Sequence, residues 1–260
     1  MRRLAVLGGA SAVFFALVAM ALASATPQVT YTSPIKQNAK AKKGKPVPIL
    51  YDGILDIKEA DGSQPPTGAT TKLYFAKQIS TMGKYFPSCK VSDIDGKPTV
   101  PAKCRKAKIG QGTAASQAGT PGSPAAINEP LKVTAYNGNG GKSLLLDLNA
   151  STPVAIQNRV IEGKIGAGSG QYGYTVTFTV PADLQQALGL QISLTHFDVK
   201  ISPKTISRKI RGTKRKISYL MLNSCPASKT LPVQAVVNFN QDNGQPGGPT
   251  VQATNTFSCK

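Results

Sequence analysis

Alternating apolar and polar residues decide the fold class of this chain, and the clearest example is Tyr172-Gly173-Tyr174-Thr175-Val176-Thr177-Phe178-Thr179-Val180. In an extended strand, successive side chains point to opposite faces. Every second residue of this stretch is aromatic or aliphatic, so one face of the strand would lie against a core. A second stripe of the same kind consists of Val233, Ala235, Val237 and Phe239. Both stripes predict half-buried β-strands.

The β pattern continues on both sides of these stripes. Segments rich in Gly, Pro, Asn and Asp separate the candidate strands, which span residues 48–58, 72–79, 131–136, 143–148, 154–165, 173–180, 190–201, 217–222, 232–239 and 250–257. One short helix is expected over residues 181–189, where apolar residues lie three and four apart before Gly189. Strands do not alternate regularly with helices, as they would in a parallel α/β sheet. We therefore predict an all-β fold, an antiparallel β-sandwich or jelly roll with one short helix.

The apolar phase changes once within a candidate strand. In residues 190–201, Ile192 and Leu194 share one phase, whereas Phe197, Val199 and Ile201 share the other. An extra residue in one strand shifts the phase in this way. We predict a β-bulge near His196.

The N-terminus has the three parts of a secretory signal peptide. Arg2 and Arg3 form a positive start, residues 4–22 are apolar or small, and Ala23-Ser24-Ala25 matches a cleavage site. We expect cleavage after Ala25 and an exported product that is secreted or lies at the cell surface. An uncleaved N-terminal membrane anchor is the alternative, because a spanning helix needs roughly 17–25 residues.

The segment after the signal predicts a basic flexible linker over residues 26–46. It contains three prolines and a run of lysines, and its apolar residues show no periodicity. Residues 47–260 are then expected to form the β-sandwich domain. A division into two packed sub-domains near 115–130 is an alternative, because residues 116–126 are almost entirely small or turn-forming and predict an exposed loop.

Four cysteines, Cys89, Cys104, Cys225 and Cys259, are an even number, which favours two disulfides in an exported chain. Three pairings are possible. We favour Cys89–Cys104 and Cys225–Cys259, because each pair falls within one stretch of the chain. A zinc site is not expected, since no pair has Cys-x-x-Cys spacing and His196 is the only histidine.

Charge is the most unusual feature of the composition. Lysine and arginine number 31 against 12 acidic residues, which gives a formal net charge of +19. The first basic cluster contains Lys36, Lys40, Lys42, Lys43 and Lys45. The second contains Lys200, Lys204, Arg208, Lys209, Arg211, Lys214, Arg215 and Lys216.

Positive fields of this kind attract polyanions. For an exported protein, the candidate partners are an anionic cell-wall polymer or an acidic lipid surface. The competing interpretation is a solvated face that keeps the protein soluble. A cytoplasmic nucleic-acid partner is not expected, because of the export signal and because single-strand binding needs stacking aromatics. Tyr219 alone stands near the second cluster.

No residue pattern predicts a catalytic site or a cofactor. His196 has Asp198 two residues away on the same strand face, but no Gly-x-Ser-x-Gly elbow accompanies them. A secreted hydrolase of esters or polysaccharide is the alternative function, and it would use His196 or two carboxylates. The carboxylates considered are Asp52, Asp56, Glu59, Asp61, Asp147 and Glu162.

Three short motifs are better explained by turns than by ligands. Asp93-Ile94-Asp95-Gly96 and Asp242-Asn243-Gly244 lack the further ligands of a calcium loop, and their composition is typical of turns. Gly110-Gln111-Gly112 resembles part of a phosphate loop, but no helix is expected after it.

Two cysteine-containing segments carry a family resemblance. They are Phe86-Pro87-Ser88-Cys89 with Cys104 and Lys108-Ile109-Gly110-Gln111-Gly112-Thr113-Ala114, and Ser224-Cys225-Pro226 with Leu231-Pro232-Val233 and Ser258-Cys259. This pattern resembles uncharacterised secreted β-sandwich proteins of actinobacteria, in which a proline usually follows the second cysteine; Arg105 stands there in this chain. The resemblance implies a disulfide-braced sandwich and no established activity.

The sequence thus favours a non-enzymatic binding or structural protein of the cell envelope, with the hydrolase as alternative. A further alternative is an assembly module that pairs its edge strands with a partner.

Overall fold

In a computed structural model, the structure describes residues 26–187, 189–202, 205–210 and 212–260. Most of them belong to one antiparallel sheet, and the predicted all-β fold is confirmed. The strand order is β17 (Thr250–Ser258), β16 (Thr230–Phe239), β4 (Gly68–Ala76), β10 (Tyr172–Thr179), β9 (Ile156–Ala167), β8 (Ser143–Ala150), β7 (Ile127–Gly138), β6 (Lys108–Gly119), β12 (Leu190–Ile201), β3 (Val47–Lys58), β15 (Leu220–Leu222) and β5 (Ile79–Thr81).

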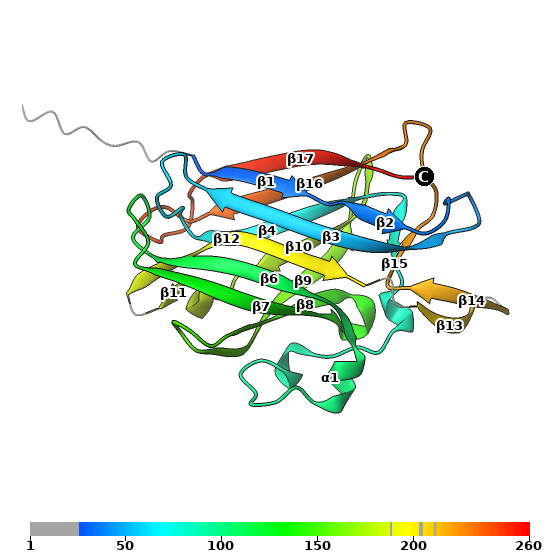
Figure 1. Ribbon diagram of the computed structural model, residues 1–260, viewed down its shortest axis with the longest axis horizontal. Coiled ribbons are helices and arrows are strands. Elements are labelled where there is room, and N and C mark those ends of the chain that lie inside the picture. The colour runs from blue at the N-terminus through cyan, green and yellow to red at the C-terminus, as the bar shows by residue number, and fades with distance from the viewer. Residues whose placement is uncertain (1–25, 188, 203–204, 211) are drawn as a thin grey trace, which may run out of the picture.

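Shorter strands extend this order. β1 (Gln28–Thr32) and β2 (Ile35–Gln37) pair with β3, and β11 (Gln186–Ala187) pairs with β12. A separate hairpin consists of β13 (Thr205–Ile210) and β14 (Thr213–Ser218). In Figure 1, β3, β12, β6 and β7 form a front layer, and β4, β10, β9 and β8 lie behind it. β1 runs beside β17, and the Asn255 side-chain amide donates a hydrogen bond to the Tyr31 carbonyl oxygen at 3.3 Å. The sheet therefore curls round a core, as the two layers of a sandwich do.

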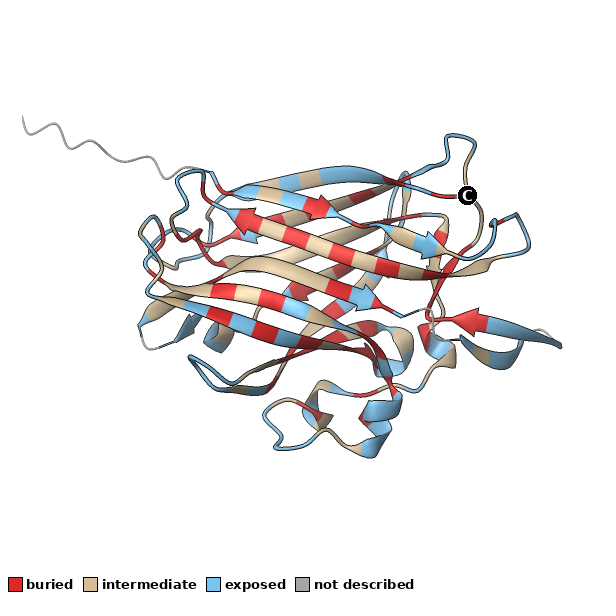
Figure 2. Ribbon diagram, in the orientation of Figure 1, coloured by how far each residue is buried: buried red, intermediate tan, exposed pale blue. Residues whose placement is uncertain are grey.

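The core lies between the two layers and consists of the inward-facing stripes. Figure 2 shows buried and half-buried residues alternating along β3. On β16 the predicted stripe is confirmed, since Val233, Ala235 and Val237 are fully buried. On β10, the ring of Tyr174 stacks on that of Phe75 of β4, with centroids 4.6 Å apart. The alternation seen in the sequence thus places both layers' apolar faces in contact.

The predicted bulge is also confirmed. The register between β12 and β6 shifts between Leu194, which pairs with Ser116, and His196, which pairs with Ala115. The extra residue, Thr195, donates a side-chain hydrogen bond to the Ala115 carbonyl oxygen at 3.1 Å. Because of this shift, Phe197 joins Leu194 on the inner face of β12.

The flexible linker predicted for residues 26–46 is wrong for its strand-forming part. Tyr31 is 3% exposed, and β1 and β2 add to the edge of β3 over residues 28–37. These strands have too few apolar residues for their periodicity to stand out in the sequence. They form because β3 offers an unpaired edge.

Two other local predictions are wrong. Residues 116–126 are not one exposed loop, because β6 continues to Gly119 and β7 begins at Ile127, and the two pair without interruption across the proposed 115–130 division. Instead of the helix predicted for residues 181–189, the structure has a 3-10 turn (Ala182–Leu184) and β11 among the residues that it describes there. A helix that the sequence did not predict, α1 (Ala102–Lys106), contains Cys104.

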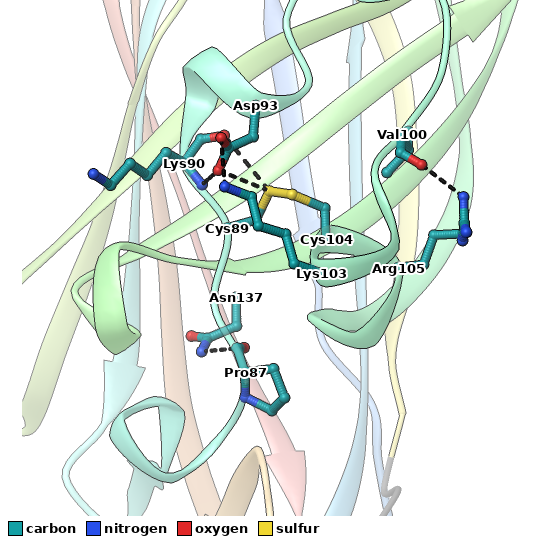
Figure 3. The surroundings of a disulfide bond; sticks show 9 residues. All are labelled: Pro87, Cys89, Lys90, Asp93, Val100, Lys103, Cys104, Arg105 and Asn137. Carbon is teal, nitrogen blue, oxygen red and sulfur yellow. Dashed lines mark hydrogen bonds and ion pairs between the residues drawn. A yellow bond between two sulfur atoms is a disulfide. The ribbon is translucent and has the colours of Figure 1, made fainter.

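Both disulfides have the predicted pairing. Cys89 and Cys104 have Cα atoms 5.0 Å apart, and Cys225 and Cys259 have Cα atoms 5.7 Å apart. The first braces a lobe, residues 83–107, that covers the outer face of β7, β8 and β9; its Ile94 packs with Leu145 and Val160 of the sheet. Figure 3 shows Asn137 of β7 reaching this lobe, where its side-chain amide donates to the Pro87 carbonyl oxygen at 2.9 Å.

The predicted signal peptide, residues 1–25, lies outside the described residues. Within the described part of the chain, none of the helices has the length and apolar character that a bilayer crossing requires.

The glycines of Gly110-Gln111-Gly112 have a structural role, not that of a phosphate loop. They lie in β6, where a Cβ atom on Gly112 would be 1.8 Å from the Asp198 carbonyl oxygen of β12, and one on Gly110 would be 2.3 Å from the Lys200 carbonyl oxygen. Only glycine permits so close an approach of two strands.

Replacing Gly112 by alanine therefore tests the packing of β6 on β12. We expect G112A to lower the free energy of unfolding by about 1–3 kcal/mol, because one strand must move away from the other. Urea denaturation measures this loss. G62A is the control, because it adds the same methyl group without a clash. A Cβ atom on Gly62 would have no atom within 4 Å. The only cost of G62A is backbone strain, since φ at Gly62 is 79°. Equal stability of G112A and the unchanged protein would contradict the close approach.

Candidate polyanion-binding surface

Five residues of the second basic cluster lie in the β13–β14 hairpin, which projects from one end of the molecule (right in Figure 1). Arg208 lies directly opposite Arg215, and Lys209 lies opposite Lys214. Like charges placed directly opposite each other destabilise an antiparallel pair. Alternate residues point to opposite faces, so the arginine pair and the lysine pair place cations on both faces of the hairpin.

These cations have no acidic partner among the described residues. Arg208, Lys209, Lys214, Arg215 and Lys216 are exposed, and none is within ion-pair distance of a carboxylate that the structure describes. Arg208 also donates from Nε to the Tyr85 carbonyl oxygen at 3.3 Å, which ties the hairpin to the body of the protein. Their charge is therefore available to an external partner.

The first basic cluster lies in β2 and in the loop that connects it to β3. Lys36, Lys40, Lys42, Lys43 and Lys45 are all exposed. The loop is held by paired backbone hydrogen bonds between Lys42 and Lys45, and by a bond from the Ala41 amide to the Lys260 carbonyl oxygen at 3.1 Å. The cluster therefore has a defined backbone.

The fold brings both clusters to the same end of the long axis. The loop after β2 and the β13–β14 hairpin both extend at the right of Figure 1, and we call this region the basic end. At the opposite end, the loops after β3 and β16 carry Glu59, Asp61 and Asp242. The pKa of Glu59 is raised by burial and by the negative charges of Asp61 and Asp242, so these acids lie close together. Three acidic residues thus gather at the end opposite the two basic clusters, which the sequence did not predict.

The three remaining residues of the second basic cluster are Lys200, Lys204 and Arg211. Lys204 and Arg211 lie outside the described residues. Lys200, on β12, forms ion pairs with Asp52 at 3.5 Å and with Asp198 at 3.2 Å. The pKa of Lys200 is raised, chiefly by the Asp198 hydrogen bond. Its charge is already compensated within the sheet.

His196 does not pair with Asp198 as the sequence suggested. Its Nδ1 atom is 2.6 Å from Oδ1 of Asp56, which lies directly opposite on β3. Both side chains are exposed, at 41% and 49%. No serine, threonine or cysteine among the described residues is hydrogen-bonded to His196, so the pair lacks the nucleophile that an esterase requires.

The two aspartates considered for calcium in Asp93-Ile94-Asp95-Gly96 bind groups of the protein itself. Asp93 accepts from the Lys90 amide at 3.0 Å and pairs with Lys103 at 2.8 Å, and its pKa is lowered chiefly by Lys103. Asp95 accepts from the Val160 amide at 2.9 Å. Asp93 also lies near Cys89 and Cys104, but their sulfurs are bonded to each other and offer no thiolate to a metal.

Asp147 is the carboxylate with the most altered environment. It lies on β8 beneath the disulfide-braced lobe and is 2% exposed. Burial raises its pKa to about 6, although the Asn149 side chain donates a hydrogen bond to it at 3.0 Å. It faces the lobe and not a cleft, so we assign it a structural role.

No protein-family model matches the sequence, and no curated protein matches it significantly.

Replacing Asp147 by asparagine should stabilise the protein at neutral pH. Because the pKa of Asp147 is higher in the folded protein than in the unfolded chain, folding binds a proton between about pH 4 and pH 6, and stability falls as pH rises through that window. We expect D147N to match the unchanged protein near pH 4 and to exceed it by about 1–3 kcal/mol at pH 7.5. Urea denaturation at both pH values measures the difference. D61N is the control, since Asp61 is exposed and its pKa is lowered by Ser63; a gain for D61N of the same size would contradict the assignment.

Proposed function

We propose that this chain is a secreted or cell-surface binding protein, without enzymatic activity, whose basic end binds an anionic polymer of the cell envelope. The observation that carries the proposal is the hairpin with Arg208 opposite Arg215 and Lys209 opposite Lys214. Like charges directly opposite each other weaken the pairing of the two strands. Solubility alone does not require that arrangement. An anionic partner offsets that weakening.

The chemistry of the hairpin favours phosphate or carboxylate groups. Arginine binds both with two parallel hydrogen bonds, and lysine binds them as a point charge. The gathering of three acidic residues at the opposite end adds an orientation effect, because the basic end would approach a polyanion first. Two disulfides are in keeping with an oxidising compartment.

The alternative functions have less support. An esterase would need a nucleophile beside the His196–Asp56 pair. The resemblance to secreted actinobacterial proteins remains a prediction from the cysteine and glycine motifs.

Binding to defined polymers tests the proposal. The probes are polyphosphate, a carboxylated polysaccharide, vesicles containing anionic phospholipid, and neutral dextran as the uncharged control. We expect affinity for one of the anionic polymers to fall steeply between 50 and 300 mM salt, because exposed charges are screened. Binding to the anionic vesicles but to neither polymer would show that the partner is a lipid surface and would contradict the polymer proposal. Absence of binding at low salt, or binding that salt does not weaken, would contradict the proposal.

Charge variants locate the site. The double variant R208Q/R215Q removes two charges from the hairpin, and we expect affinity to fall about threefold to tenfold. The matched control is K58Q/K97Q, which also removes two exposed charges but lies away from the basic end. If both double variants weaken binding equally, net charge and not the hairpin determines the interaction.

A further inference from the structure

A cavity of about 140 Å³ lies within the core, between the two layers of the sheet. Several residues that line it are apolar but only half-buried, although they belong to the inner face; they include Leu73, Leu144, Leu194 and Phe197. An unfilled apolar cavity costs about 24 cal/mol for each Å³. An engineered apolar cavity of similar size in another protein stays dry and binds benzene or xenon. This space is therefore suited to a small apolar molecule.

The cavity lining carries no charge. Its polar groups are hydroxyls of threonine and tyrosine, and the remaining lining residues are aliphatic, aromatic or glycine. Burial raises the pKa of Tyr174 and of Tyr219, so these phenols stay protonated. A charged ligand would lose its hydration without gaining a partner. The lining thus selects a neutral molecule.

One lining residue, Tyr219, has a buried hydroxyl without a hydrogen-bond partner among the described residues. Tyr219 is 4% exposed, and within the described part of the chain its buried Oη atom is bonded to no other group. By contrast, the hydroxyls of Tyr31 and Tyr51 are hydrogen-bonded to each other. The Tyr219 ring is held by an edge contact with Phe86, with centroids 6.0 Å apart. A buried hydroxyl without a partner is unfavourable, so Tyr219 is available as a donor to a ligand in the cavity.

We propose that the cavity binds a small neutral apolar molecule with one carbonyl oxygen, which accepts a hydrogen bond from Tyr219 Oη. The hydrocarbon part lies against Leu144, Leu194 and Phe197. This site is internal and does not depend on the basic end, so it is independent of polymer binding.

Two probes of nearly equal shape test the proposal, namely ethylbenzene and acetophenone, which differ by the carbonyl oxygen. We expect isothermal titration calorimetry to detect binding of both to the purified protein. In the variant Y219F, we expect acetophenone affinity to fall about tenfold, as for loss of one hydrogen bond, and ethylbenzene affinity to stay unchanged. An equal effect of Y219F on both probes would overturn the role of Tyr219.

Two substitutions on one strand locate the site. Ala114 of β6 lines the cavity, whereas the next residue, Ala115, does not. We expect A114L to abolish binding of both probes and A115L to preserve it. If A114L does not fold, xenon replaces it: xenon should shift the methyl NMR signals of Leu144 and Leu194 in the unchanged protein. Failure of ethylbenzene to bind, together with unchanged methyl signals under xenon, would overturn the cavity site.

Discussion

The structure depends on burying the inner face of one continuous antiparallel sheet. Successive residues of a strand point to opposite faces, so each strand can give its apolar side chains to the core only while its register is kept. β16 shows the rule in its simplest form, with Leu231, Val233, Ala235 and Val237 fully buried. In β12 the apolar residues change from one alternation to the other between Leu194 and Phe197. The bulge at Thr195 compensates for this change, so that Phe197 again faces the core. The strands must keep their register where the sheet curves from one layer to the other. In the front layer, the glycines of β6 allow a close approach to the backbone of β12.

Because the core takes one face of the sheet, the other face is free for different purposes. Over β7, β8 and β9 it is covered by the lobe that the Cys89–Cys104 disulfide braces, and a buried carboxyl, Asp147, lies beneath that lobe. On β3 and β12 it carries compensated charges, such as Lys200 with Asp52 and Asp198. The exposed cations of the projecting β13–β14 hairpin have no such neighbour. The hairpin's position therefore explains why its charge remains available.

The two proposed sites lie in different parts of the molecule. The basic end is formed by segments that leave the sheet, and its chemistry is that of exposed arginine and lysine. The cavity is formed where the two inner faces do not fill the space between them, and its chemistry is that of aliphatic side chains and one unpartnered phenol. Neither site uses the His196–Asp56 pair, which lies on the exposed outer face of the front layer.

The sequence by itself determined the features that local rules govern. The two-residue period predicted the β class and the stripes of β10 and β16, the phase change predicted the bulge, and cysteine spacing predicted both disulfides. It missed β1 and β2, whose short strands are stabilised by the edge of β3 and not by their own pattern. Only the tertiary structure placed His196 opposite Asp56, brought both basic clusters to one end, compensated Lys200, and left a cavity with Tyr219 in its wall. Each of these depends on which strands are neighbours, and strand order is set by packing between residues that are far apart in the chain.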